Sequence, residues 1–149
     1  MPASSRFAVA VHTLTLLASK GGVPLKSEQI AASVNTNAVV IRRILCALAS
    51  AGLVASQTGA AGGTRLARPP ARITLLDVRR ALDEEGGAFS LHRRAPDRRC
   101  AVGMSIGRAL EDVLREVDSA VERVLDRVTI EDVLGKIRAC GRRGARAGR

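Results

Sequence analysis

The strongest constraint on the fold is a pair of short amphipathic segments separated by a three-residue polar turn. Ser27 can cap a helix that runs to Val34, because its hydroxyl can accept from the free amides of the first turn. Residues 35–37, Asn-Thr-Asn, supply turn chemistry, since asparagine tolerates a left-handed backbone and Asn37 can cap a following helix. A second helix is expected over residues 38–51. Two short helices joined this tightly predict a helix-turn-helix.

The second helix of this pair is predicted to have one buried face and one basic face. Its apolar residues at helical spacing are Ile41, Ile44, Leu45 and Leu48. The same spacing turns other residues outward, namely Val39, Arg42, Arg43 and Cys46. An exposed arginine-bearing helix after a helix-turn-helix turn is typical of an element that reads duplex DNA.

A β-hairpin is predicted directly after this helix. Gly52 ends the helix, and residues 53–56 and 65–67 can pair as strands around a glycine-rich tip at 58–63. The glycines at 59, 62 and 63 suit a hairpin that needs positive φ. No Gly-Lys-Ser/Thr follows them, so a nucleotide-binding loop is not indicated. A helix-turn-helix followed by a hairpin predicts a winged helix-turn-helix.

A long apolar seam over residues 105–126 predicts contact with a second subunit. Its apolar residues advance by alternating threes and fours, and 22 helical residues span roughly 33 Å, which exceeds the width of a small winged domain. We therefore expect a homodimer whose long helices pack partly on the partner. The expected dimerisation residues are Ile106, Leu110, Val113, Leu114, Val117, Val121 and Val124.

The expected fold is mainly α, a winged helix-turn-helix with a small β-hairpin wing plus a long dimerisation helix. The winged domain is expected over residues 1–84, including a first helix at 5–19 and a short one that Thr74 caps. A polar linker is expected at 85–104, followed by the dimerisation helix and a C-terminal helix over 105–138, which a Thr129 and Asp132 capping box begins. The basic tail at 139–149 is expected to be disordered.

Charge favours nucleic acid as the partner. The formal net charge is +10 with a pI of about 11.3, and 21 of the 24 basic residues are arginine, although the bias of a GC-rich genome also explains part of that excess. Two Phe with no Tyr or Trp argue against stacking of splayed RNA bases, which favours double-stranded DNA. No apolar stretch approaches a membrane span and no secretion signal is evident, so a cytoplasmic protein without a membrane partner is expected.

Catalytic and metal-binding constellations are not indicated. Cys46, Cys100 and Cys140 are too widely spaced for a disulfide framework or zinc knuckle, so reduced thiols are expected. His12 and His92 lack a third ligand-type partner, which predicts a packed His12 and an exposed His92. No base, nucleophile or metal set is gathered, so an enzyme, a metal site and a cofactor are not expected.

Several segments in this order resemble one family of bacterial regulators. They are Ala32–Ile44, Gly62–Arg68, Ile73–Val78, Cys100–Gly103 and Thr129–Leu134. Together they resemble the Rrf2 family, to which IscR, NsrR and CymR belong, and most of all its YwnA-like branch. The resemblance covers nearly the whole chain to about Ile137. It implies a DNA-binding dimer in which the long helix crosses between subunits.

The helix-turn-helix and the resemblance together select the positions expected to contact DNA. These are Ser27, Asn37, Val39, Val40, Arg42, Arg43, Gly62, Gly63 and Arg65. Family members often carry an arginine before the glycine of the wing tip, where this chain has Thr58 before Gly59, so wing contact is expected to be weaker or shifted to Arg65. Cluster-binding relatives hold three close cysteines before the long helix, whereas this chain has only Cys100 there, which puts such a cluster in doubt.

The expected function is a sequence-specific transcriptional regulator, a repressor, with an input that the sequence leaves open. Cys100 is the candidate for sensing oxidants or electrophiles, because four arginines precede it closely and positive charge stabilises a thiolate; they are Arg93, Arg94, Arg98 and Arg99. An inert thiol is the other reading. The alternative input is a noncovalent small-molecule effector bound between the winged domain and the long helix.

Overall fold

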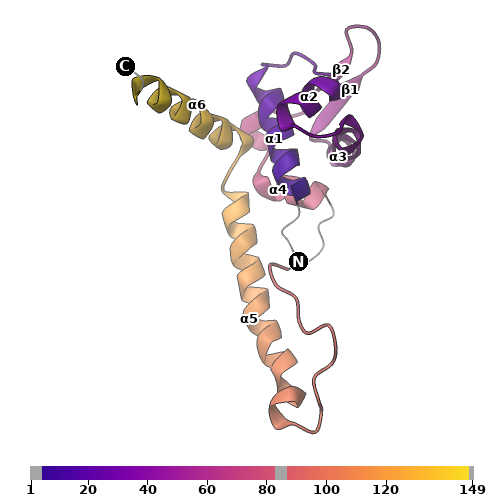
Figure 1. The fold of residues 1–149 in the computed structure, drawn as a ribbon, viewed down its shortest axis with the longest axis vertical. Helices are drawn as coiled ribbons and strands as arrows, with labels where there is room; N and C mark the ends of the chain where they lie inside the picture. Colours follow the sequence, from indigo (N-terminus) through magenta and orange to yellow (C-terminus); the bar gives the residue numbers. More distant parts are fainter. Residues whose placement is uncertain (1–4, 83–86, 148–149) are drawn as a thin grey trace.

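The fold is a small helical head from which one long helix extends, as Figure 1 shows. The computed structural model describes residues 5–82 and 87–147, with side chains described to residue 142. In chain order the elements are α1 (Ser5–Ser19), α2 (Ser27–Val34), α3 (Ala38–Ser50), β1 (Val54–Gln57), β2 (Gly63–Leu66), the 3-10 turn η1 (Pro70–Arg72), α4 (Leu75–Ala81), α5 (Ala101–Asp126) and α6 (Ile130–Ala147). The predicted fold class, mainly α with a two-stranded hairpin wing, is confirmed.

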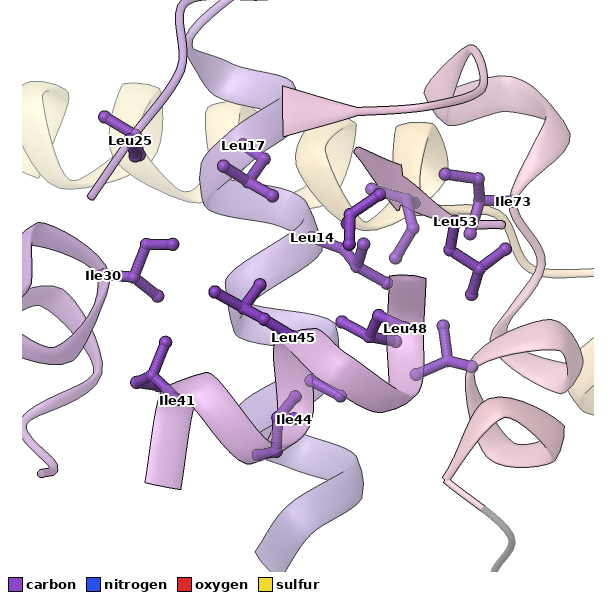
Figure 2. Packing of buried hydrophobic residues seen from close by; sticks show 14 of the residues in the cluster. Leu14, Leu17, Leu25, Ile30, Ile41, Ile44, Leu45, Leu48, Leu53 and Ile73 are labelled. Carbon is purple, nitrogen blue, oxygen red and sulfur yellow. The ribbon is translucent and has the colours of Figure 1, made fainter. Parts of the chain in front are cut away.

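One hydrophobic core holds the head together. Leu14 of α1, Ile41 and Leu48 of α3, and Ile73 after η1 are almost completely buried, and Figure 2 shows their side chains converging. Ile130, the first residue of α6, is also completely buried in this cluster. The start of α6 therefore belongs to the packed head, because it contributes to the same core that positions α3.

Local hydrogen bonds set the turn between α2 and α3. Asn35 adopts the left-handed conformation at φ 59°, and the Thr36 amide donates to the Ala31 carbonyl at 3.0 Å. Asn37 then caps α3, since its Oδ1 accepts from the Val39 amide at 2.8 Å. Both roles agree with the turn chemistry expected from the sequence.

The cap of α2 differs from the expectation. Ser27 is the first helical residue and Lys26 occupies the capping position. The Gln29 side chain accepts from the Lys26 backbone amide at 2.8 Å, which satisfies one donor of the first turn. The sequence is compatible with Ser27 as either the capping residue or the first helical residue. The hydrogen bond from the Lys26 amide to Gln29, three residues later, makes Lys26 the capping residue.

The wing is an antiparallel hairpin that is also tied to the segment before α2. Val54 lies opposite Leu66 and Gln57 opposite Gly63. Leu25 exchanges two backbone hydrogen bonds with Thr64, at 2.9 and 2.8 Å, so β2 has a backbone partner on each side. A Cβ at Gly63 would lie 2.7 Å from the Leu25 carbonyl oxygen, and φ there is +152°. This close approach holds the base of the wing against the head.

The requirement for glycine at the wing tip has two different causes. Gly59 and Gly63 have positive φ, as expected from the sequence. Gly62 does not, and the expectation of positive φ is wrong for it. A Cβ at Gly62 would instead lie 2.3 Å from the Gln57 carbonyl oxygen, so the turn is too tight for a side chain.

Two capping boxes begin α4 and α6 side by side. Asp77 accepts from the Thr74 amide at 3.0 Å while Thr74 Oγ1 accepts from the Asp77 amide at 3.1 Å. Thr129 and Asp132 repeat this arrangement at 2.8 and 3.1 Å. The Ile130 amide donates to the Ile73 carbonyl at 2.9 Å, which joins the two helix starts. Aspartate at the third position therefore suffices in both boxes.

The long helix begins earlier than expected and leaves the head. It starts at Ala101, four residues before the expected start at 105, with Cys100 as its capping residue. Its contacts with the head include the ion pair between Arg80 and Glu122, with 3.7 Å between the nitrogen and oxygen. The Ala88 amide of the preceding connection donates to Asp118 at 2.7 Å. Among the described residues of α5, none is buried.

The final helix is longer than the sequence suggested. A disordered tail was expected over residues 139–149, whereas α6 continues to Ala147. Its first turns are packed in the head, and the following residues are rich in alanine and arginine, which are strong helix formers. Once a packed turn has nucleated a helix, each further residue adds a hydrogen bond at little cost, so the helix propagates beyond its tertiary contacts.

Candidate nucleic-acid interface

The outward face of α3 carries the residues expected to contact DNA. Val39 and Val40 are 48% and 38% exposed, and Arg43 is exposed beside them without a polar partner among the described side chains. The opposite face, Ile41, Ile44, Leu45 and Leu48, is buried in the core. This division confirms the predicted faces of the helix. Exposed valines offer apolar contact to thymine methyl groups, and an arginine suits guanine or phosphate.

One of the two polar groups of the Asn37 side chain is already used in capping α3. Its side-chain oxygen accepts from the Val39 amide at 2.8 Å, which leaves the side-chain NH2 group to point away from that bond. The capped end also directs the free amides of the first turn outward. The N-terminus of α3 therefore combines a side-chain donor with the positive end of a helix, which suits a phosphate or an acceptor on a base edge.

Arg42 is held by a carboxylate of the preceding helix, α2. Its guanidinium forms an ion pair with the Glu28 carboxylate across the helix-turn-helix. The pKa of Glu28 lies below its usual range, because its own backbone N–H and then the Arg42 guanidinium stabilise the carboxylate. The two residues are 14 positions apart, so helical periodicity alone does not pair them. Both side chains remain more than half exposed.

The wing presents a third exposed arginine. Arg65 of β2 is exposed and lies opposite Ala55 of β1. Gly62 and Gly63 are half-buried and contribute backbone to the tight tip rather than side chains. Ser27 is half-buried at the first position of α2, where helix amides are free. Between residues 26 and 68 the chain has five basic residues and one carboxylate, Glu28, so the helix-turn-helix and wing together carry a net positive charge.

An apolar stripe along α5, defined by the seven expected dimerisation residues, is only partly covered by the described residues of the protomer. Val113 is 55% exposed and Val124 is 61% exposed, and the remaining members are half-buried. They share one helix face because they recur every three or four residues, with Val113 and Leu114 adjacent, while charged residues occupy the other face. An amphipathic helix of 26 residues, about 39 Å long, with no buried residue has its stripe available for another surface.

Cys100 is exposed at the start of α5. The pKa of its thiol is lowered by hydrogen bonds from the backbone amides of Gly103 and then Val102, which stabilise a thiolate at the helix N-terminus. Thiolate stabilisation was expected from the four preceding arginines, whereas the lowered pKa comes from the helix amides instead. The free amides of a helix N-terminus stabilise an anion beside them, while the four arginines are exposed in the connection.

The histidines do not form a metal site with their neighbours. His12 Nε2 lies 3.0 Å from the Ser33 hydroxyl of α2, and His12 is exposed rather than packed as expected. His92 is exposed in the connection before α5. Within the described part of the chain, no three His, Cys, Asp or Glu side chains gather closely enough to hold a metal ion.

Comparison with known proteins assigns the chain and its fold to a family. A sequence profile of the Rrf2 family, described as iron-dependent transcriptional regulators, matches residues 3–136. This chain belongs to the Rrf2 family. That result confirms the resemblance seen in the sequence, including its closeness to YwnA. The YwnA protein of Bacillus subtilis, assigned as an HTH-type transcriptional regulator, is 37% identical over 134 residues, which cover 90% of this chain and 98% of YwnA.

Solved structures of Rrf2 proteins share the fold. A crystal structure assigned to a DNA-binding protein has a TM-score of 0.69 at 37% identity and covers 87% of this chain and 99% of its own. CymR, the global cysteine regulator of B. subtilis, has a TM-score of 0.69 at 25% identity and covers 91% of this chain and 98% of its own. The family and its members are transcriptional regulators, so this Rrf2 protein is a regulator and not an enzyme.

The iron in the family description can be tested against the cysteines of this Rrf2 protein. Thiolate ligands must converge on one cluster. Cys46 lies on α3, Cys100 begins α5 and Cys140 lies on α6, and all three are exposed. Figure 1 shows the start of α5 at the end of the molecule opposite to α3 and α6. The donors of one protomer do not fit an iron-sulfur cluster.

Among the described residues, no single helix is both long and apolar enough to cross a bilayer, although α2 and α3 taken as one bent pair pass by length and composition.

Proposed function

We propose that this Rrf2 regulator binds specific duplex DNA sequences as a homodimer, with α3 in the major groove and the wing beside it. The observation that carries the proposal is the exposed face of α3, which follows a capped turn and presents Val39, Val40 and Arg43 on the positive side of the head. A helix-turn-helix uses its second helix in this way. Arg65 of the wing and the first turn of α2, at Ser27, are the flanking contacts to phosphate.

The homodimer rests on the stripe along α5. Burial of apolar area contributes about 25 cal/mol per Å², so a 26-residue amphipathic helix without a partner would leave much of its stabilisation unused. A second copy offers a matching uncharged stripe, and two copies related by a twofold axis would carry two α3 helices. Paired heads favour a pseudo-palindromic operator with half-sites spaced by about one helical turn or a multiple of it.

The test is selection of bound fragments from genomic DNA at moderate salt, followed by titration of the enriched fragment and a scrambled version of it. We expect the enriched fragments to share an inverted repeat and to bind about 10³-fold or more tightly than the scrambled one. Equal affinity for both would refute a specific regulator. Transcription in vitro from a promoter containing the repeat tests the further prediction of a repressor, which requires less transcript when the protein is added.

A thiol input at Cys100 is proposed for the regulator in place of a metal cluster. The thiol is exposed, and its pKa is lowered by the first amides of α5. A thiolate displaces hydroxide from a peroxide to give a sulfenic acid, so that the sulfur is oxidised and the peroxide reduced. Cys100 begins the long helix, and modification there would change the junction between the connection and α5. If Cys100 is instead an inert thiol, the regulator has no thiol input at this position.

A further inference from the structure

We propose that a hollow between α1 and α6 binds a neutral, lipophilic small molecule, and that its occupancy alters DNA binding through His12 and Ser33. The binding site goes beyond the proposed function, while its effect rests on the proposed DNA binding. An effector was expected between the winged domain and the long helix. The hollow instead lies against the final helix, α6.

The hollow is formed within one protomer. Its volume is about 560 Å³, and its walls include Phe7, Val11 and Leu16 of α1, Leu75 of α4, and Val133 and Ile137 of α6. Sites for small molecules are commonly about 300–1,000 Å³ and mostly apolar. The hollow therefore has the size and the surface of such a site.

The polar groups of the hollow define the class of ligand. Among the described residues that line it there is no Lys, Arg, Asp or Glu, so an ionised ligand would lose hydration without gaining an opposite charge from them. The Thr15 and Ser19 hydroxyls both donate to carbonyls of α1, at 2.7 Å each. His12 is then the lining side chain that remains for a polar contact. These features fit a neutral ring or chain with one hydrogen-bonding group.

His12 also connects the hollow to the DNA-reading elements. Its Nε2 lies 3.0 Å from the Ser33 hydroxyl near the end of α2, and the left-handed Asn35 turn then leads directly into α3. A ligand that hydrogen-bonds to the imidazole or displaces it must change this tie between α1 and α2. The position of α3 depends on α2, because both pack on Leu14 and its neighbours in one core. Occupancy of the hollow and DNA binding are thus coupled.

A small molecule suits the hollow better than a second copy does. The long apolar stripe that stays partly exposed runs along α5, whereas the hollow has walls from three helices of the same head. A partner helix needs an elongated open groove, since it is about 10 Å across with its side chains. The α5 stripe is therefore assigned to the partner and the hollow to a ligand.

The experiment uses N-phenyl-1-naphthylamine, a neutral aromatic amine with three rings whose fluorescence rises in apolar surroundings. We expect saturable binding to the full-length protein. Ala8→Trp, which places an indole in the hollow, should abolish the signal, and the smaller Ala8→Leu should weaken it. The matched control Ala49→Trp adds the same ring at an exposed position of α3 outside the hollow and should leave probe binding unchanged.

DNA titration with and without saturating probe tests the coupling. The wild-type affinity should change by at least about fivefold, the low end of ordinary allosteric coupling. Ser33→Ala should bind the probe normally but lose that change. Absence of saturable probe binding, or normal binding by Ala8→Trp, would overturn the site. Ala8→Trp that becomes monomeric in light scattering would assign the hollow to the dimer interface and also overturn it. Wild-type protein without DNA affinity would refute the proposed function, while the probe titration would still decide the site.

Discussion

Glu28 of α2 and Arg42 of α3 form an ion pair across the helix-turn-helix. This pair holds one of the two arginines on the outward side of α3 and leaves Arg43 beside it free of a polar partner among the described side chains. The same carboxylate is the one acidic group between residues 26 and 68. DNA phosphates would be repelled by Glu28 and would compete with it for Arg42. The pair therefore opposes binding while it orients the guanidinium.

Glu28→Gln should tighten DNA binding severalfold at low salt. Glutamine keeps the size of the side chain but removes the negative charge, so Arg42 is released to phosphate and the repulsion disappears. Fluorescence anisotropy on the selected operator measures the effect, and Glu111→Gln on α5 is the matched control with unchanged affinity. Weaker binding by Glu28→Gln would show that orientation of Arg42 matters more than its release.

Arg43→Ala should weaken binding to the operator by about 1–3 kcal/mol if the guanidinium contacts a base. A loss that is equal on specific and scrambled DNA, with a salt slope reduced by about one, would assign Arg43 to phosphate instead. The measurement is a series of titrations between 50 and 200 mM salt, as for other phosphate-dependent complexes. Arg108→Ala on α5 removes the same charge elsewhere and serves as the control. An unchanged affinity and slope would remove Arg43 from the interface.

Val117→Asp should convert the dimer to a monomer. The substitution places a carboxylate in the middle of the α5 stripe, where a partner would bury it without an opposite charge. Val121→Asp should act in the same way. Ser119→Asp adds the same charge on the exposed polar side of α5 and should leave the dimer intact. Light scattering at micromolar concentration makes the comparison, and a wild-type monomer would contradict the homodimer directly.

Asp132→Asn should make stability less sensitive to acid. The pKa of Asp132 lies below its usual range, because the Thr129 backbone N–H and then its hydroxyl stabilise the carboxylate. A lowered pKa in the folded state means that the contribution is complete above the unfolded value of about 3.9 and is lost as the pH falls through the folded value. Between pH 7 and pH 3 the midpoint temperature of thermal unfolding should therefore fall more steeply for wild type than for Asp132→Asn. Glu131→Gln, on the same turn, should follow wild type.

The protein should be colourless after anaerobic purification, and any thiol response should depend on Cys100. Mild peroxide should weaken DNA binding of wild type but not of Cys100→Ser, since the exposed thiol with lowered pKa is the one at the start of α5. Cys46→Ser and Cys140→Ser are the matched controls and should respond as wild type does. Equal responses by wild type and Cys100→Ser would reject the thiol input. Visible absorbance with bound iron would show that cysteine ligands assemble across subunits.

The sequence by itself determined the features that depend on neighbouring residues. Asn37 caps α3 through an amide two residues away, and Thr74 with Asp77 closes a box over three. These interactions form wherever the helix starts, so the residue pattern suffices. The buried and exposed faces of α3 and the stripe of α5 likewise follow from helical spacing alone. The helix-turn-helix, the wing and the family resemblance could be predicted for this reason.

Only the tertiary structure decided which distant residues meet. Leu25 joins β2 through Thr64, Ile130 completes the core of the head, and Glu28 holds Arg42. His12 of α1 reaches Ser33 of α2 in the same way. None of these contacts lies within one helical turn or one hairpin, because the separation of the residues along the chain is set by how whole elements pack. Packing of the shared core brings these residues together, and that core exists only after all the helices of the head have assembled.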